Sequence, residues 1–449
     1  MKYLYIEVEI YVREFDSRYL LSLEAAKRGF EVYIGHRNQI YYLALNNQLA
    51  PGIIHKKDLN TTSEEIKVLK KLQKKGFIFT SQDEESGVLY NNFDDFSKRR
   101  FDNLEAINFF KFFFAWGERD KKYFESKIPN SKCVFVSSGS PRIDLCKESF
   151  LKNDKYFTKR NHIKKKYILI SSNIQLPIGF ISLADASENI WKNTLHNREW
   201  NEEYLYEYVS RSTLILYELI KCIRFLSKNL NDYLIVIRPH PTEKIDSWNK
   251  ILGSKLENVK IIRDLTIIDN LAEAEILIHA GCMSAIESYF AKIPALFFYP
   301  IKLKKDCYQD IFCLLNPVID SKEALLDYII KNKYKNNSEI YDNSELKNRI
   351  SNYDKNDYAY SKIIYYIDKI AIETNRKVKI KKKNFIQVKI KNFIKKLIFK
   401  ESSDYHFIKF PPLDKGKIKS LHDNFCKHDT AFSKVRFELI DEKFLKVFL

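Results

Sequence analysis

Short apolar runs with strand spacing alternate with helical patterns in the first third of this 449-residue chain. Apolar positions Ile6, Val8, Ile10 and Val12 alternate with polar ones and predict a strand over residues 3–12, followed by a helix from about 18 to 28. Later strands are expected at 30–35, 53–54, 76–80 and 133–136, and the aromatic run 109–116 is assigned to the helical material between them. A strand, helix and strand in succession predict a parallel sheet.

The same alternation returns in the second half of the chain. Strands are expected at 167–171, 233–237, 259–263, 275–279 and 294–299, and the longest helix at about 203–230. Continuous aliphatic runs of this kind are typical of buried parallel strands. We therefore expect an α/β protein with two Rossmann-like domains.

Changes in composition place the domain boundaries. Residues 151–166 are polar and lysine-rich with no apolar period, which indicates an interdomain linker. We expect an N-terminal domain at 1–150, a C-terminal domain at 165–345, closing helices at 346–375 and a basic tail at 376–449.

The strand at 233–237 ends in a rigid polar turn. It runs into Arg238-Pro239-His240-Pro241, where two prolines prevent both a helix and further sheet pairing. Arg238 and His240 are thereby placed at the C-terminal edge of a sheet, where open α/β folds bind their ligands.

A second polar turn follows the strand that ends at His279. Gly281 relaxes the backbone, Cys282 follows it, and Ser284 begins a helix whose unpaired N–H groups and dipole favour an anion. Glu287 lies one turn into this helix. It is placed either to reach a ribose hydroxyl beside a bound phosphate or to close a capping box with Ser284.

The net charge of +18 predicts an anionic partner: a nucleic acid, a membrane surface or a phosphorylated small molecule. Residues 376–400 place Ile, Phe and Leu at helical spacing among lysines, the composition of an interfacial membrane helix. The alternative is a basic helix that packs its apolar stripe on the protein body. No nucleic-acid-binding motif accompanies the charge, so we expect no nucleic-acid partner.

The remaining bulk features indicate the cytoplasm. The seven cysteines contain no CxxC pair and fit reduced thiols. The N-terminal apolar run is soon broken by acidic residues, unlike a signal peptide, and no apolar segment approaches membrane-spanning length.

Several motifs carry a family resemblance over about residues 1–330. The turn at 238–241 resembles the His-Pro motif of capsule and lipopolysaccharide Kdo transferases, polysialyltransferases and CDP-glycerol polymerases. Residues 279–287 and 139–144 resemble a helix start and a turn in the same group. Residues 9–18 resemble the start of bacterial surface carbohydrate biosynthesis proteins, among which the closest named activity is that of the retaining β-Kdo transferases.

This resemblance implies a GT-B fold, with the two domains facing a cleft. It implies a glycosyltransferase that moves an acidic sugar, Kdo or similar, from a CMP-sugar to a growing surface glycan of the O-antigen or capsule type. It further implies no divalent metal and no cofactor, and the sequence has no Asp-x-Asp motif. The enzyme would be cytoplasmic and peripheral on the inner face of the cell membrane, where its lipid-linked acceptor lies.

The resemblance also assigns roles to individual residues. His240 would act in catalysis, and a retaining reaction could use a carboxylate such as Asp185 or Glu207, with Glu188 a further candidate. Binding of the donor nucleotide is assigned to Arg238, His279, Gly281, Cys282, Ser284 and Glu287. Binding of the sugar or acceptor is assigned to Glu9, Arg13, Asp16, Arg18 and Arg142.

Other functions stay open at this point. A polyol-phosphate transferase that uses CDP-glycerol or CDP-ribitol shares the His-Pro motif, and a hydrolysing sugar-nucleotide epimerase has a similar fold. A noncatalytic basic adaptor that binds a nucleotide or anionic lipid is the alternative from another class.

Overall fold

The computed structural model divides the chain into two compact units. Unit 1 comprises residues 1–88, 100–145 and 344–449, and unit 2 comprises 89–99 and 146–343. The structure describes residues 1–59, 62–101, 104–151, 163–180, 182–190, 202–253, 256–263, 265–301, 309–331, 344–380 and 409–449. The expected linker at 151–166 lies largely outside these residues.

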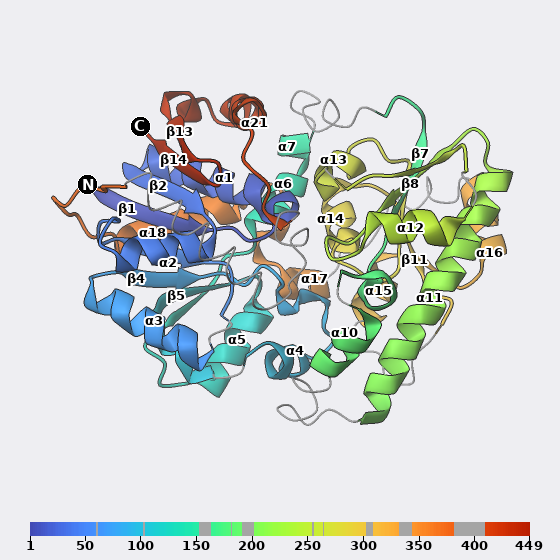
Figure 1. The fold of residues 1–449 in the computed structure, drawn as a ribbon, viewed down its shortest axis with the longest axis horizontal. Helices are drawn as coiled ribbons and strands as arrows, with labels where there is room; N and C mark the ends of the chain where they lie inside the picture. Colours follow the sequence, from blue (N-terminus) through green and yellow to red (C-terminus); the bar gives the residue numbers. More distant parts are fainter. Residues whose placement is uncertain are drawn as a thin grey trace. The chain divides into compact units, whose positions relative to one another are not determined.

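Unit 1 is built on strands β1–β6 and a C-terminal hairpin (Figure 1). Its strands are β1 Lys2–Glu7, β2 Phe30–Gly35, β3 Ile53–Lys56, β4 Ile78–Ser81, β5 Phe110–Ala115, β6 Val134–Ser137, β13 Arg436–Asp441 and β14 Phe444–Phe448. Its helices are α1 Tyr11–Lys27, α2 Arg37–Leu45, α3 Ser63–Lys74, α5 Glu118–Lys127, α6 Pro141–Cys146, α17 Ser344–Arg349, α18 Ala359–Lys369 and α21 Lys415–His428. Short 3-10 segments are η1 Gly87–Leu89, η2 Leu104–Phe109, η5 Ser351–Tyr353 and η6 Thr430–Lys434.

The eight strands of unit 1 form one sheet in the order β13-β14-β2-β1-β3-β4-β5-β6. Strands β1 to β6 are parallel, and β14 pairs antiparallel with β2. The strand order reverses direction between β1 and β3. In open α/β sheets such a reversal creates a ligand-binding crevice at the C-terminal ends of the strands.

Two sequence predictions in unit 1 were wrong. The strand predicted over 3–12 ends at Glu7, and α1 begins at Tyr11 rather than at residue 18. The Glu14 carboxylate accepts from the Glu9 N–H at 2.7 Å and lies in the first turn of α1, where the helix dipole favours an acid. Residues 110–115 of the run 109–116 form strand β5 rather than a helix. This strand lies between β4 and β6, and its aromatic side chains are buried on the two faces of the sheet, a setting that favours aromatic residues.

The C-terminal residues 409–449 belong to unit 1, whereas the sequence had placed all of 376–449 in one basic tail. Strand β14 extends the sheet by pairing with β2, and Figure 1 shows the red hairpin beside the blue strands. The Tyr19 hydroxyl on α1 hydrogen-bonds His422 Nδ1 on α21 at 2.9 Å. Apolar side chains of this segment, including Phe425 and Phe432, are fully buried.

Unit 2 contains the second sheet. Its strands are β7 Tyr167–Ser171, β8 Leu234–Arg238, β9 Val259–Ile261, β10 Ile276–His279, β11 Ala295–Phe298 and β12 Val318–Ile319. Its helices include α7 Glu148–Leu151, α9 Gln175–Ile178, α10 Leu183–Ile190, α11 Glu202–Asn229, α12 Ile245–Leu252, α13 Ile267–Leu271, α14 Ser284–Ala291, α15 Gln309–Leu315 and α16 Lys322–Ile330. Helix α4, Phe93–Arg100, runs to the boundary of this unit.

The six strands of unit 2 are all parallel, in the order β12-β11-β10-β7-β8-β9. Numbered within the unit, this is the 3-2-1-4-5-6 order of a Rossmann sheet, and it reverses between β7 and β10. Alternate strand residues such as Ile168, Ile237 and Ile278 pack with Ile223 of α11 and Trp248 of α12 in one core. The expected α/β class with two Rossmann-like units is thus confirmed.

Candidate functional site

The His240 turn follows β8, and the Gly281–Ser284 turn follows β10; β7 lies between these two strands. The loop after β7 contacts both turns. Ser172 donates its N–H to the Arg238 carbonyl at 3.3 Å, and Asn173 Nδ2 donates to the Gly281 carbonyl at 2.9 Å. The two turns that the sequence singled out therefore lie at the same edge of the sheet, on either side of the loop after β7.

The His240 ring is held from one side by its own turn. Its Nδ1 lies 2.7 Å from the Thr242 hydroxyl and accepts from the Thr242 N–H at 3.3 Å. Because that N–H can only donate, Nδ1 is the acceptor, and the proton of the neutral ring is on Nε2. The turn thus fixes the tautomer and makes Nε2 the hydrogen-bond donor of the ring.

Glu243 makes several hydrogen bonds that hold the same turn in place. Its buried carboxylate accepts from the Ser172 hydroxyl at 2.7 Å, the Ile174 N–H at 2.7 Å and Trp248 Nε1 at 2.9 Å. Its own N–H donates to the His240 carbonyl at 2.9 Å. Burial raises the pKa of Glu243, while these donors oppose the rise. One carboxylate therefore joins the loop after β7, the His240 turn and helix α12.

The Gly281–Ser284 turn has the backbone that its glycine requires. Gly281 has a φ of +90°, and a Cβ there would lie 3.3 Å from the Phe312 ring. Cys282 Sγ lies 2.6 Å from Ser284 Oγ and is buried, which raises the pKa of the thiol. Helix α14 begins at Ser284, and the N–H groups of Ala285 and Ile286 already donate to the carbonyls of Cys282 and Met283 at 3.1 and 3.0 Å.

His279 shapes the turn from inside the sheet. Its Nδ1 accepts from the Gly281 N–H at 3.2 Å, and its ring stacks on Phe297 with centroids 5.3 Å apart. The side chain is 1% exposed, and burial lowers its pKa to about 3. Its contact with a nucleotide stays a prediction.

The other predicted residues of unit 2 lie in different settings. Glu287 is buried one turn into α14, where Met283 is the N-cap and no side chain caps the helix, so the capping box with Ser284 is absent. Asp185 is exposed on α10 and exchanges hydrogen bonds with Ser182 at 2.6 and 3.1 Å. Glu207 lies on α11. Both carboxylates lie on helices rather than at strand ends, and their catalytic role stays a prediction.

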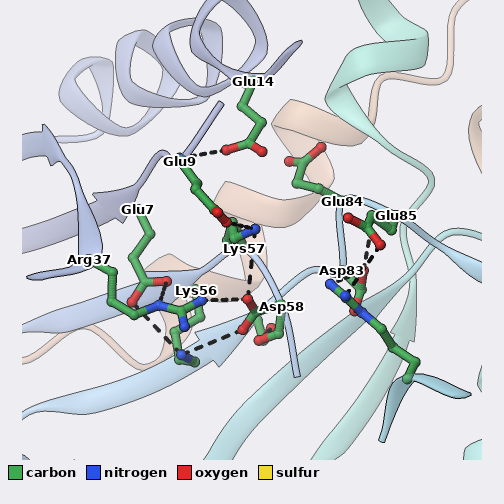
Figure 2. Close-up of polar contacts among 12 residues, drawn as sticks. Glu7, Glu9, Glu14, Arg37, Lys56, Lys57, Asp58, Asp83, Glu84 and Glu85 are labelled. Atoms are coloured by element: carbon green, nitrogen blue, oxygen red, sulfur yellow. Dashed lines mark hydrogen bonds and ion pairs between the residues drawn. The ribbon is translucent and has the colours of Figure 1, made fainter. Parts of the chain in front are cut away.

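A second polar cluster lies at the C-terminal edge of the unit 1 sheet, where β1, β3 and β4 end. Figure 2 shows Glu7, Arg37, Lys56 and Asp58 pointing toward one another. Lys56 is completely buried and pairs with Glu65 and, at 3.7 Å, with Asp58. Burial alone would raise the pKa of Asp58, but Lys56, Arg37 and Lys57 outweigh it and lower this pKa to about 2.

Two of the predicted acceptor residues, Glu9 and Arg13, belong to this cluster, where carboxylates face cations. Glu9 pairs with Lys57 and, at 2.8 Å, with Lys409 from the C-terminal segment. Arg13 pairs with Glu14 at 2.9 Å. The cations of this cluster already pair with carboxylates of the protein. An incoming anion would have to compete with those carboxylates for the cations.

Three further predicted residues lie deeper, on α1 and α6. Arg18, 1% exposed, pairs with Glu84 at 2.7 Å, and Arg142 Nη1 donates to the Glu84 carbonyl at 3.1 Å. Asp16 is buried on α1 rather than in the predicted loop. All three side chains are buried, and their binding roles stay predictions.

Sequence reasoning missed several residues that organise these sites. Glu243 comes two residues after Pro241, and its signal was an acid near the start of a helix with an apolar face. The triplet Lys56-Lys57-Asp58 begins at the last residue of β3, which is the same signal of polar residues at a strand end. Lys409 gave no signal, because its partner Glu9 is 400 residues away in the sequence.

Neither a metal site nor a membrane span is found in the described part of the chain. It contains no group of three or more His, Cys, Asp or Glu residues that could hold a metal ion. None of its helices is long and apolar enough to cross a bilayer.

Comparisons with known proteins give likenesses at the level of structure alone. No protein-family model and no curated protein matches the chain. A structure of S. aureus MnaA with UDP is 15% identical, covering 82% of this chain and 98% of that chain at a TM-score of 0.48. A UDP-GlcNAc 2-epimerase from Neisseria meningitidis is 14% identical (82% and 100%, TM-score 0.48), as is the wall teichoic acid polymerase TagF (82% and 89%, TM-score 0.49). With TM-scores below 0.5, these likenesses carry no weight in assigning a function.

Proposed function

We propose that this chain is a glycosyltransferase that moves an acidic sugar, Kdo or similar, from a CMP-sugar to a growing lipid-linked surface glycan. The observation that carries the proposal is the junction of the His240 turn and the Gly281–Ser284 turn by Ser172 and Asn173. The donor phosphate would bind at the Gly281–Ser284 turn, which leads into the N-terminus of α14, and the dipole of a helix favours an anion at that end.

His240 would act on the bond that breaks. With Nδ1 occupied by Thr242, its Nε2–H can donate to the departing CMP phosphate and stabilise the charge that develops there. The protonated ring could instead act as a general acid. For a retaining course, Asp185 and Glu207 are the proposed nucleophiles, and of the two Asp185 is held by Ser182.

The cluster in unit 1 would bind the acceptor. Its most exposed carboxylates are those of Glu85, 48% exposed, and Glu9, 30% exposed. Carboxylates accept hydrogen bonds from sugar hydroxyls, and the cations beside them keep both ionised. Arg13 and Arg18 already pair with protein carboxylates, so they are less suited to bind a carboxylate of the acceptor. The cluster is therefore better suited to bind the hydroxyl groups of an acceptor sugar.

A panel of nucleotides in the presence of EDTA tests this proposal by thermal shift. CMP at a hundredfold excess over its Kd should stabilise the protein by about 2.7 kcal/mol and raise Tm by a few degrees. Glu287→Ala should weaken CMP binding by about 1–3 kcal/mol if it contacts the ribose. Preferential stabilisation by CDP-glycerol would instead indicate a polyol-phosphate transferase, and by UDP an epimerase. A chain that responds to no nucleotide would be the basic adaptor.

A further inference from the structure

Arg263 lies at the same sheet edge as the His240 turn, on its outer side. Strand β9 pairs with β8 so that Ile261 faces Ile237, and the Ile262 N–H donates to the Ile237 carbonyl at 2.9 Å. Arg263 follows directly, and β7 and β8 separate β9 from β10 in the sheet. Three strand spacings of about 4.8 Å thus separate the strand before Arg263 from the strand before the Gly281–Ser284 turn, about 14 Å in all.

The Arg263 guanidinium lacks the partners that such a group normally has. Its Nε and Nη2 are shielded from solvent and have no hydrogen-bond partner, and no ion pair involves this residue in the described part of the chain. Burial lowers the pKa of Arg263, and the Glu243 charge opposes this fall. The Glu243 oxygens accept from Ser172, Ile174 and Trp248, and neither a hydrogen bond nor an ion pair joins this carboxylate to the Arg263 guanidinium.

Other arginines of unit 2 differ from Arg263 in this respect. Arg211 Nε donates to the Ile301 carbonyl at 3.0 Å, and Arg224 Nη1 donates to the Leu252 carbonyl. A shielded guanidinium edge without acceptors costs free energy, and in native proteins such groups usually have a partner. The two shielded donors on one edge of the Arg263 guanidinium therefore point to a ligand.

The surroundings of Arg263 connect it to the His240 turn. Its guanidinium lies over the Phe180 ring, with Cζ 5.5 Å from the ring centroid. The Phe180 N–H donates to the Thr242 carbonyl at 3.0 Å, and Thr242 also holds the His240 ring. The arginine is thus placed by the same backbone segments that place the proposed catalytic histidine.

We propose that Arg263 is a second anion subsite for the donor, which binds an anionic group other than the phosphate at the Gly281–Ser284 turn. Nε and Nη2 share one edge of the guanidinium, and their parallel N–H bonds match two oxygens of a carboxylate or phosphate. The group is either the carboxylate of an acidic sugar or the second phosphate of a diphosphate. The inference rests on the proposed function and deepens it, because it requires a donor with two anionic groups.

Calorimetry on the full chain tests the subsite with four probes: CMP, CDP, a CMP-linked keto-sugar acid and inorganic pyrophosphate. Arg263→Gln should weaken the probe with the correct second anion about 10–100-fold and CMP less than about threefold. Loss confined to the sugar acid identifies the carboxylate, and loss for CDP identifies the second phosphate. Arg224→Gln, which removes an arginine that already has a carbonyl partner, should change none of these affinities.

Several results would overturn the subsite. These are an equal loss for all probes, no loss for any probe, or the same loss in Arg224→Gln. Arg263→Lys separates binding from folding, because it keeps the charge but not the parallel N–H pair, and it should melt like the wild type yet bind the second anion weakly. If the wild type binds no cytidine nucleotide, the proposed function fails. The subsite then stands only if pyrophosphate binds the wild type and not Arg263→Gln.

Discussion

Two histidines at strand ends look equivalent in the sequence, and their surroundings separate them. His279 is enclosed by Phe297 and Phe312 and bonded to its own turn, and burial lowers its pKa to about 3, so its ring is neutral at physiological pH. His240 is half-buried, with Nδ1 fixed by Thr242. The sequence could locate both because prolines and glycine mark the turns. It could not assign their burial, because the rings over His279 come from β11 and α15.

We expect His240 to be required for transfer and dispensable for folding. His240→Ala should reduce the rate of CMP release from the donor at least about 100-fold, as loss of a group that assists the leaving phosphate does. Its Tm should stay within a few degrees of wild type. Thr242→Val should show a smaller loss, because the ring remains but its tautomer is no longer fixed. A variant of His240 that melts early yet turns over normally per folded molecule would make this residue structural, and His428→Ala controls for loss of an imidazole in unit 1.

At the level of elements, the sequence located the strands better than it located where they end. It predicted β3, β4 and β6, whose apolar runs are short and bounded by polar residues. It extended β1 through the first turn of α1, because Ile10 and Val12 continue the alternation of apolar and polar residues that Ile6 and Val8 begin. It assigned β5 to a helix, because an aromatic run alone does not distinguish the two structures. The sequence could predict charged residues at the strand ends. It could not predict the network of ion pairs that they form with one another, because that depends on which strands are neighbours in the sheet.

That network should make unit 1 sensitive to acid. The pKa of Asp58 is lowered from 3.8 to about 2, so its ionised form stabilises the folded state by about 2 kcal/mol above pH 3.8, and this contribution is lost as the pH falls toward 2. Glu9, Glu14 and Glu85 also have lowered pKa values, so they act in the same direction. Between pH 5 and 3, the Tm of the wild type should fall more steeply than that of Asp58→Asn. Asp232→Asn, a change on an exposed turn of unit 2, should keep the wild-type slope.

The contact of the C-terminal hairpin with β2 can be tested at a single glycine. A Cβ on Gly35 would lie 2.7 Å from Phe444 Cε2, inside the distance that packed atoms allow. Gly35→Ala should destabilise the protein by about 1–3 kcal/mol, as overpacking does. The double variant with Phe444→Leu should recover much of this loss in a denaturant titration. If Phe444→Leu adds its own penalty without any recovery, the two residues do not pack together as described.

For the whole molecule, the sequence predicted two α/β units but not the chain path that completes unit 1. Apolar positions alternate over 435–448, yet nothing local indicates that β14 pairs with β2, where Phe444 is the partner of Gly35 from the other end of the chain. Long-range pairing of this kind depends on which sheet edge is left open, and that is a property of the assembled sheet. The same limit applies to Lys409 and Glu9, and to the pairing of Lys2 with Asp368 at 2.9 Å.

This chain path changes how the proposed membrane contact has to be tested. Residues 381–400 lie outside the described residues, but the structure describes residues on both sides of them in unit 1. Truncation after residue 374 would remove β13 and β14 together with the lysines, so loss of lipid binding would be confounded by damage to the sheet. Replacing the lysines of 379–396 with glutamine leaves 409–449 intact and separates the two effects.

We expect the glutamine variant to fail to sediment with liposomes that contain anionic lipid, while its Tm and its CMP affinity stay at wild-type values. Each basic residue near an anionic surface contributes about 1 kcal/mol, so removing several of them outweighs what the Ile, Phe and Leu stripe retains. Wild-type binding should weaken as salt is raised, because the attraction is screened over about 10 Å at 0.1 M. Neutral liposomes serve as the control and should bind neither protein well. A variant that melts early or loses CMP would show that the segment packs on the protein body, which is the alternative that its composition left open.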